Sequence, residues 1–494
     1  MGKAAKITVK AQAISSKIRQ NSVRNTMSSN IFGHQRREPL KKALAIRKIA
    51  FTEIYESDNT VDVQQQASRC LSCGSPFCEW KCPLHNPISK WLKLAAEGKI
   101  IEAAELSHHT NSLPEICGRV CPQEKLCELA CVLHDTTGSI TIGHIERYVN
   151  DTAFEMGWRP TSSPIRSVNK CVAIVGAGPA GLSCADVLIR NGVNVVVFDK
   201  HPEIGGLLTF GIPSFKLEKK LMVQRREIFT EMGIQFQLNT EVGTDISLDE
   251  LLCTYDAIFI GTGTYQAIRG NVPKKPIQGV FESLPYLIAN TRHLMQLPTP
   301  NDEPYINLHS KSVIVLGGGD TAMDCVRSAI RQGAKQVSCL YRRDEQSLPA
   351  SRKEVVNALD EGAQFHFNLQ VTQFVVNEQQ QLTGVYATRT QNGKLENGRY
   401  QLELIDDSTF FIEADAVIVA YGFAPHDQVW LNNALIKRDK YGHILANRNS
   451  PIPFQTSHEK VFAGGDIIRG SDLVVTAIDD GRNAAEGILL FLGV

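Results

Sequence analysis

The 494-residue sequence lacks several features that would assign it to a common class of protein. It has no uninterrupted apolar run near about eighteen residues, so we predict no transmembrane helix. It has no excess charge of one sign, because Lys plus Arg and Asp plus Glu both number 52, whereas nucleic-acid-binding domains are usually basic. It has no apolar core near its start of the kind that an export signal needs. We therefore expect a cytoplasmic protein with no membrane and no nucleic acid as partner.

Acidic residues are nearly absent from the first 48 residues, where Glu38 is the only one. A basic, acid-poor leader is compatible with an organelle transit peptide. However, residues 39–48 resemble the start of the folded part, so the simpler interpretation is a mobile basic tail over residues 1–38. Such a tail could contact an acidic partner.

Cysteines are abundant but uneven, since eight of the thirteen lie in a short region with a helical pattern between its two strings. The eight are Cys70, Cys73, Cys78, Cys82, Cys117, Cys121, Cys127 and Cys131. Without an export signal, a disulfide framework is disfavoured. Structural zinc usually takes two separated pairs of ligands, which fits strings of three or four cysteines less well. We therefore predict a small helical domain with iron–sulfur sites, and keep zinc and free or disulfide-bonded thiols as alternatives.

The first string ends in Cys82-Pro83 and resembles the bacterial ferredoxin arrangement, in which the fourth cysteine of a string binds the other of two 4Fe-4S clusters. This resemblance implies one cluster on Cys70, Cys73, Cys78 and Cys131. It implies a second cluster on Cys82, Cys121 and Cys127.

A first dinucleotide fingerprint follows an apolar strand over residues 172–175, in Gly176-x-Gly178-x-x-Gly181. Such glycines allow a tight turn and the close approach of a pyrophosphate to a helix N-terminus. The next strand, over residues 193–198, ends at Asp199, the acid expected to bind a ribose hydroxyl. Strand, turn, helix, strand and acid in this order are strong evidence for a nucleotide site.

A second fingerprint, Gly317-x-Gly319-x-x-Ala322, follows the strand over residues 313–316. Its next strand ends at Arg342 and Arg343 instead of an acid. A cationic pair at this position suits the 2′-phosphate of NADP, although two solvated arginines at a strand end are the alternative.

The C-terminal motif Gly464-Gly465-Asp466 is followed by a helix rich in small residues. We predict that the acid binds the ribitol of a flavin and that the helix N-terminus points at its isoalloxazine; an ordinary strand-turn-helix is the alternative. Glycine-rich strand ends near residues 255–265 and 414–425 suggest further close approaches, and the apolar, glycine-rich segment 204–217 is expected to line the flavin site. The predicted cofactor-binding residues are Gly176, Gly178, Pro179, Ala180, Gly181, Asp199, Gly206, Leu207, Gly263, Gly317, Gly319, Asp320, Thr321, Ala322, Arg342, Arg343, Gly422, Gly465, Asp466, Thr476 and Ala477.

Two chemical signatures are missing and narrow the class of enzyme. We find no nucleophile elbow of the Ser-His-Asp type, and no redox cysteine pair soon after the first fingerprint. Two dinucleotide folds then suggest one tightly held FAD and one exchanging NADPH, with cofactors that carry the chemistry. NADPH gives a two-electron hydride, a flavin can release electrons singly, and iron–sulfur clusters accept them singly. No site for a final substrate is evident, so we expect the electrons to pass to a partner protein.

From about Pro39 to the C-terminus, the sequence resembles the small (beta) subunit family of bacterial NADPH-dependent glutamate synthase. The resemblance rests on long motifs such as "RCLSCGSPFCEWKCPLHNPI", "VFDKHPEIGGLLTFGIPSFKLEK" and "GGDIIRGSDLVVTAIDDGRNAA". It implies that NADPH reduces FAD and that electrons pass through two 4Fe-4S clusters to a large (alpha) subunit. That subunit makes glutamate from glutamine and 2-oxoglutarate.

Related cluster domains, such as that of dihydropyrimidine dehydrogenase, complete the second cluster with a ligand other than cysteine. The resemblance places Glu146 at this position and leaves Cys117 without a cluster role. The alternative is that Glu146 is an acid on a helix surface.

We expect an α/β fold with two Rossmann-like domains, in which the NADPH domain is inserted into the FAD domain, preceded by the helical iron–sulfur domain. The expected boundaries are a tail over 1–38, the iron–sulfur domain over 39–165, the FAD domain over 166–295 and 420–494, and the NADPH domain over 296–419. Two other functions stay open. One is a paralogous reductase that feeds a pyrimidine-reducing or ferredoxin-linked partner, and the other is a flavin- and zinc-binding interaction protein.

Overall fold

The structure is a computed structural model that describes the chain except residues 1–33, 57, 161–166, 274, 299, 301–302, 397–398, 427 and 434. Most of the predicted tail, and the predicted boundary at residue 165, therefore lie outside the described residues. Residues 34–38 do not behave as a tail, because Arg36 donates a hydrogen bond to Glu128 of the helical domain at 2.9 Å. In the described part of the chain, no helix is long and apolar enough to cross a membrane.

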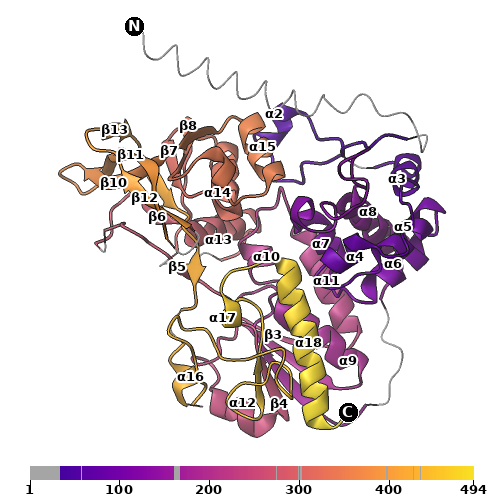
Figure 1. Cartoon of the computed structure of the whole chain (residues 1–494). Coiled ribbons are helices and arrows are strands. Elements are labelled where there is room, and N and C mark those ends of the chain that lie inside the picture. Colours follow the sequence, from indigo (N-terminus) through magenta and orange to yellow (C-terminus); the bar gives the residue numbers. More distant parts are fainter. Residues whose placement is uncertain are drawn as a thin grey trace.

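The N-terminal domain is helical, as the leucine- and alanine-rich pattern predicted (Figure 1). Its elements are α2 (Leu44–Arg47), α3 (Thr60–Ala67), α4 (Phe77–Lys81), α5 (Ile88–Ala96), α6 (Ile100–His108), α7 (Pro114–Val120), the 3-10 helix η1 (Gln123–Lys125) and α8 (Ile142–Glu155). The core of the domain packs Trp91 of α5 against Ile145 and Val149 of α8, and all three side chains are fully buried. This core supports the loops that carry the cysteines.

The second domain contains a five-stranded parallel sheet in the order β16-β4-β1-β2-β3. Its strands are β1 (Cys171–Val175), β2 (Asn194–Asp199), β3 (Gln235–Leu238), β4 (Ala257–Ile260) and β16 (Val461–Ala463). Its helices are α9 (Pro179–Arg190), α10 (Leu207–Phe210), α11 (Lys220–Glu231), α12 (Leu248–Thr254), α16 (Trp430–Asn433), α17 (Asp466–Arg469) and α18 (Val474–Leu492). The strand β4 is buried along its whole length, as expected for a parallel sheet between helices.

The third domain contains a second five-stranded parallel sheet, in the order β6-β14-β7-β8-β9. Its strands are β6 (Val280–Glu282), β7 (Ser312–Leu316), β8 (Gln336–Tyr341), β9 (Gln364–Phe367) and β14 (Ala416–Val419). Its helical elements are α13 (Ser283–Leu294), α14 (Asp320–Arg331), η2 (Glu345–Ser347) and α15 (Arg352–Glu361). An antiparallel sheet projects from this domain and consists of β10 (Leu369–Val376), β11 (Leu382–Glu396), β12 (Arg399–Leu404) and β13 (Phe410–Glu413).

The third domain is inserted into the second, but it begins earlier than residue 296. The prediction assigned residues up to 295 to the FAD domain, yet β6 pairs with β14 in the second sheet and α13 packs beside it. The two domains are joined instead by a short ribbon of β5 (Gln266–Ala267) and β15 (Phe423–Ala424). The prediction was wrong here because a three-residue strand carries no local signal of the sheet that it joins.

Candidate functional site

A cavity lies where the three domains meet, and it is lined by residues of both fingerprints and of the helical domain. The predicted residues on its wall are Gly176, Gly178, Pro179, Ala180, Asp199, Gly206, Leu207, Gly263, Asp320, Thr321, Gly465, Asp466 and Ala477. The helical domain contributes the loop from Arg119 to Glu124, which includes Cys121. We call this space the central cavity. Motifs far apart in the sequence therefore share one site.

The turn of the first fingerprint is possible only with glycine. Gly176 has a φ of 104°, and a Cβ there would lie 2.6 Å from the carbonyl oxygen of Gly261. A Cβ on Gly181 would lie 1.9 Å from the carbonyl oxygen of Gly176, so α9 packs tightly on the turn. The open N-terminus of α9 faces the central cavity through Pro179 and Ala180. This arrangement suits a pyrophosphate.

Asp199 ends β2, as predicted, and its carboxylate already accepts two backbone hydrogen bonds. Its donors are the N–H groups of Ala177, at 2.7 Å, and His201, at 2.8 Å. Burial raises the pKa of Asp199, and the two N–H donors oppose this effect. Asp199 also lines a side hollow with Thr240 and Gln428. Since each carboxylate oxygen can accept more than one bond, a ribose hydroxyl could still bind here.

The C-terminal motif reaches the central cavity through Gly465 and Asp466. Burial, with the nearby carboxylate of Asp472, raises the pKa of Asp466 to about 7, while the backbone N–H of Asp472 opposes this. The first turn of α18 also lines the cavity through Val474 and Ala477. Thr476 is not on the cavity wall, and its hydroxyl donates to the carbonyl oxygen of Leu473 at 2.7 Å. A role for Thr476 in binding the cofactor stays a prediction.

The second fingerprint has the same turn, since Gly317 has a φ of 139° and a Cβ there would lie 2.2 Å from the carbonyl oxygen of Ala420. Gly319 is the N-cap residue of α14, and Asp320 and Thr321 of its first turn line the central cavity. The side chain of Asp320 accepts a hydrogen bond from the Ser351 N–H at 2.9 Å. Gly317, Gly319, Ala322 and Gly422 shape the turn and its neighbouring strand ends without lining the cavity.

Arg342 and Arg343 follow β8 and are not part of the central cavity wall. Arg342 is exposed, whereas Arg343 is half-buried. The Nε atom of Arg343 is buried and has no hydrogen-bond partner among the described residues. An unsatisfied guanidinium donor beside the second fingerprint fits a phosphate.

The cysteines that the ferredoxin resemblance assigned to two clusters all lie in the helical domain. Cys70, Cys73, Cys78 and Cys131 line one small cavity, and we call them the first thiol group. The side chains of Cys82, Cys121, Cys127 and Glu146 influence one another electrostatically, and we call them the second thiol group. Only the second group reaches the central cavity, through Cys121.

Partly buried thiols in both groups hold their protons tightly. Burial raises the pKa of Cys78 and of Cys82 to about 12, and neighbouring thiols or carboxylates add to the effect. A metal must displace these protons, so metal binding here depends on pH. No three His, Cys, Asp or Glu side chains of the described residues are arranged to hold a single metal ion. A 4Fe-4S cluster does not require its ligands to converge on one metal ion, because its four ligands bind four different iron atoms.

Glu146 lies on α8 in the second thiol group, where burial and the carboxylate of Glu115 raise its pKa to about 8. Asn111 forms a side-chain hydrogen bond with Glu146 and also accepts one from the Cys117 thiol, with an Sγ–Oδ1 distance of 3.8 Å. A half-buried carboxyl group among thiols fits a cationic metal centre. Cys117 hydrogen-bonds with Cys121 and remains close to the group. No sequence motif indicates the position of Asn111 between Glu146 and Cys117.

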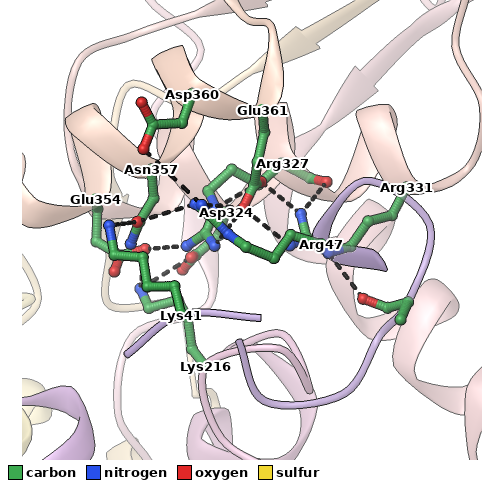
Figure 2. A network of polar contacts seen from close by, with 11 residues as sticks. Lys41, Arg47, Lys216, Asp324, Arg327, Arg331, Glu354, Asn357, Asp360 and Glu361 are labelled. Carbon is green, nitrogen blue, oxygen red and sulfur yellow. Dashed lines mark hydrogen bonds and ion pairs between the residues drawn. The ribbon is translucent and has the colours of Figure 1, made fainter. Parts of the chain in front are cut away.

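Sequence reasoning also missed a set of charged side chains on the wall of the central cavity, which Figure 2 shows with their partners. Lys216 follows α10 and forms an ion pair with Asp324 of α14 at 2.9 Å. Burial raises the pKa of Asp324 to about 6 despite Lys216. Burial opposes ionisation of Glu354 as well, but Arg327 and Lys216 lower its pKa to about 2. These residues lack a motif, so only their positions in space connect them.

Comparisons with known proteins agree with this organisation. Residues 47–158 match the family model described as dihydropyrimidine dehydrogenase domain II, 4Fe-4S cluster, and residues 170–481 match the model of pyridine nucleotide-disulphide oxidoreductases. The glutamate synthase (NADPH) small chain of Escherichia coli K12 is 58% identical over 95% of this chain and 100% of its own length. The chain belongs to the glutamate synthase small-chain family. The family predicted from the sequence motifs is thereby confirmed, and so is its class as a flavin- and nicotinamide-dependent oxidoreductase with iron–sulfur sites.

Two further proteins are similar to this chain, one in sequence and one in fold. A putative oxidoreductase of Escherichia coli K12, AegA, is 54% identical over 93% of this chain, which covers 70% of AegA. The structure of Mycobacterium tuberculosis FprA in complex with NADPH aligns with a TM-score of 0.53 at 16% identity, over 66% of this chain and 85% of FprA. The FprA likeness shows the fold alone, and together with the two matching domains it confirms the predicted fold class.

Proposed function

We propose that the chain is the NADPH-oxidising, electron-input subunit of a glutamate synthase, holding FAD and two 4Fe-4S clusters. Its partner would be a large subunit that makes glutamate from glutamine and 2-oxoglutarate, and its location would be the cytoplasm. When bound, the FAD would take a hydride from NADPH and the clusters would carry single electrons onward. The observation that carries this proposal is the central cavity, whose wall combines both fingerprints with Cys121.

The residues of the chain would bind and orient the two nucleotides so that their rings meet. The turn from Gly176 to Pro179 would hold the FAD pyrophosphate, and Arg342 with Arg343 would hold the 2′-phosphate of NADPH. Apolar side chains on the cavity wall, including Leu207, Leu284 and Leu287, would exclude water from the meeting point.

The positions of the thiol groups favour one direction of electron flow. The second thiol group adjoins the central cavity through Cys121, so electrons would enter there. The first thiol group lies beside Leu71, Phe77 and Trp80, which are 43%, 54% and 67% exposed. Electrons would therefore leave through the first group, close to the surface of the molecule.

Anaerobic titration with NADPH and NADH, with iron analysis, tests this function. We expect NADPH to bleach the flavin absorbance much more effectively than NADH, in a protein with about eight irons per chain. A flavin that NADPH does not bleach would contradict the reductase function. Zinc in place of iron would remove the electron path.

The likeness to AegA favours one alternative, a reductase that feeds a different acceptor. Adding the large subunit, glutamine and 2-oxoglutarate separates the two functions. Glutamate formation at the rate of NADPH oxidation supports the proposal. NADPH oxidation with an artificial acceptor, but no glutamate formation with the large subunit, would favour the alternative.

A further inference from the structure

The apolar cluster that joins the two nucleotide-binding domains is small. Apart from the ribbon of β5 and β15, their apolar junction centres on three buried side chains, Phe210 of α10 with Leu284 and Ile288 of α13. Domains joined by a small interface move relative to one another unless something else holds them. Hydride transfer requires the reacting atoms to lie within about 3.5 Å, so the relative position of these domains matters for the proposed function.

A charged network lies at this junction and includes side chains of α14 and α15 (Figure 2). The Glu361 carboxylate accepts two hydrogen bonds from Arg327, at 2.9 and 3.0 Å, and two from Arg331, at 2.6 and 3.0 Å. The three side chains are fully buried. Bidentate, buried pairs of this kind fix geometry as well as charge.

The flavin domain inserts two side chains into this network. Phe215 packs on the guanidinium groups of Arg331 and Arg327, which lie 3.9 and 4.5 Å from the centre of its ring. The next residue, Lys216, pairs with Asp324 at 2.9 Å and reaches Glu354 at 3.8 Å. The loop of the flavin domain is thus anchored directly on the helices of the nicotinamide domain.

The helical domain adds a third attachment through residues 41–53, which we call the clamp segment. Lys41 donates to the Asn357 side chain at 2.7 Å, and Arg47 reaches both Asn357, at 3.2 Å, and Glu361, at 3.4 Å. The carbonyl oxygen of Ala50 accepts a hydrogen bond from Arg331 at 3.0 Å. Lys41, Arg47 and Ala50 of the clamp segment therefore contact α14 and α15.

The other end of the clamp segment holds the remaining two domains. The Glu53 carboxylate accepts hydrogen bonds from Arg147, at 2.7 Å, and Arg119, at 3.3 Å, in the helical domain. The Glu53 N–H donates to Glu218 of the flavin domain at 3.1 Å. One short segment consequently contacts all three domains.

We infer that the clamp segment fixes the nicotinamide domain over the flavin domain, and that Arg47 is a positioning residue for hydride transfer. This inference rests on the proposed function, because positioning matters only if NADPH reduces a bound flavin. Arg47 does not line the central cavity, so it acts through Glu361 and α15 and not by contact with a cofactor.

The test compares Arg47→Met with Arg37→Met in the full-length protein carrying its flavin and clusters. Arg37 is a matched control, because its exposed ion pair with Asp62, at 2.9 Å, lies within the helical domain. Before NADPH is added, we expect faster amide hydrogen exchange in α2 and α15 of Arg47→Met only. At saturating NADPH, anaerobic stopped-flow should show flavin reduction slowed roughly tenfold or more, with unchanged flavin content.

The two readouts separate failure of the inference from failure of the proposed function. Equal exchange and equal reduction rates in Arg47→Met and Arg37→Met would overturn the clamp. A lower melting temperature without a slower reduction would also overturn it, since that result indicates a structural role alone. If NADPH does not reduce the flavin of the unaltered protein, the proposed function fails whatever the exchange data show.

If Arg47→Met does not fold, Lys41→Met provides a milder break, because it removes one hydrogen bond to Asn357. We then expect the same changes with smaller amplitude. A Lys41→Met protein with the exchange and reduction rates of Arg37→Met would contradict the inference.

Discussion

The two nucleotide-binding domains begin with the same strand, glycine turn and helix, but a different kind of helix packs on the first helix in each domain. In the flavin domain, α18 packs on α9 through small residues, and a Cβ on Gly481 would lie 2.0 Å from the carbonyl oxygen of Ala180. In the nicotinamide domain, α15 meets α14 through the buried ion pairs of Arg327 and Arg331 with Glu361. Tight backbone packing suits a cofactor that stays bound. The charged surface is where the other two domains attach.

The largest expected effect comes from the third position of the fingerprint, which is Gly181 in one domain and Ala322 in the other. Gly181→Ala should abolish most flavin binding, because its Cβ would lie 1.9 Å from the carbonyl oxygen of Gly176. Ala322→Gly should retain flavin and lose only about 1 kcal/mol of stability, the cost of glycine in a helix. Flavin absorbance of the purified variants and thermal unfolding measure both. Normal flavin content in Gly181→Ala would contradict the tight turn.

The second prediction uses the strand ends that distinguish the two domains, Asp199 and the Arg342–Arg343 pair. Replacing both arginines by alanine should raise the KM for NADPH by roughly 10- to 100-fold or more, since the loss of even one charge-assisted hydrogen bond costs about 1.5–3 kcal/mol. The KM for NADH should change little. Lys335→Ala is the control, because Lys335 precedes β8 at its opposite end. A parallel rise in both KM values would show that the pair does not recognise the 2′-phosphate.

The third prediction concerns how stability depends on pH. This dependence should distinguish the charged contact between α14 and α15 from the apolar contact between α9 and α18. Burial acts to raise the pKa of Glu354, but Arg327 and Lys216 outweigh burial and lower this pKa from 4.5 to about 2. A lowered folded-state pKa gives stability that is present above about pH 4.5 and is lost as the pH falls towards 2. The free energy of unfolding of Glu354→Gln should lose this part of its pH dependence, as denaturant titrations between pH 3 and 7 would show. An unchanged slope would mean that Glu354 is not held ionised by its neighbours.

The smallest expected effect is that of Arg226→Ala, which removes a partly exposed ion pair with Glu203 at 2.8 Å in the flavin domain. Partly exposed pairs contribute about 0–1 kcal/mol, so the melting temperature should change by only a few degrees at most. The contrast with Glu354→Gln would show that the buried network, and not charge in general, distinguishes the two domains.

Local patterns were enough to predict much of the fold and site. The turns at Gly176 and Gly317 follow from motifs of a few tens of residues, and the insertion of one domain in the other follows from the order of the fingerprints along the chain. The assignment of the cysteines to two clusters came from the ferredoxin resemblance and stays a prediction. The sequence could not reveal that β6 joins the second sheet, because pairing with β14 joins residues far apart in the chain. It could not reveal the contact of Arg47 with Glu361, 314 positions away. Charged residues without a motif look like solvated surface until the fold brings them together.

The electron path from the central cavity through the second thiol group is the central claim, and comparing Cys82→Ser with Cys117→Ser tests it most directly. Cys82 belongs to that group, whereas Cys117 lies beside it and hydrogen-bonds with Cys121 and Asn111. For Cys117→Ser we predict about eight irons per chain and glutamate formation with the large subunit. For Cys82→Ser we predict about four irons, a flavin that NADPH still bleaches, and no glutamate. Full iron content and undiminished glutamate formation in Cys82→Ser would contradict the path.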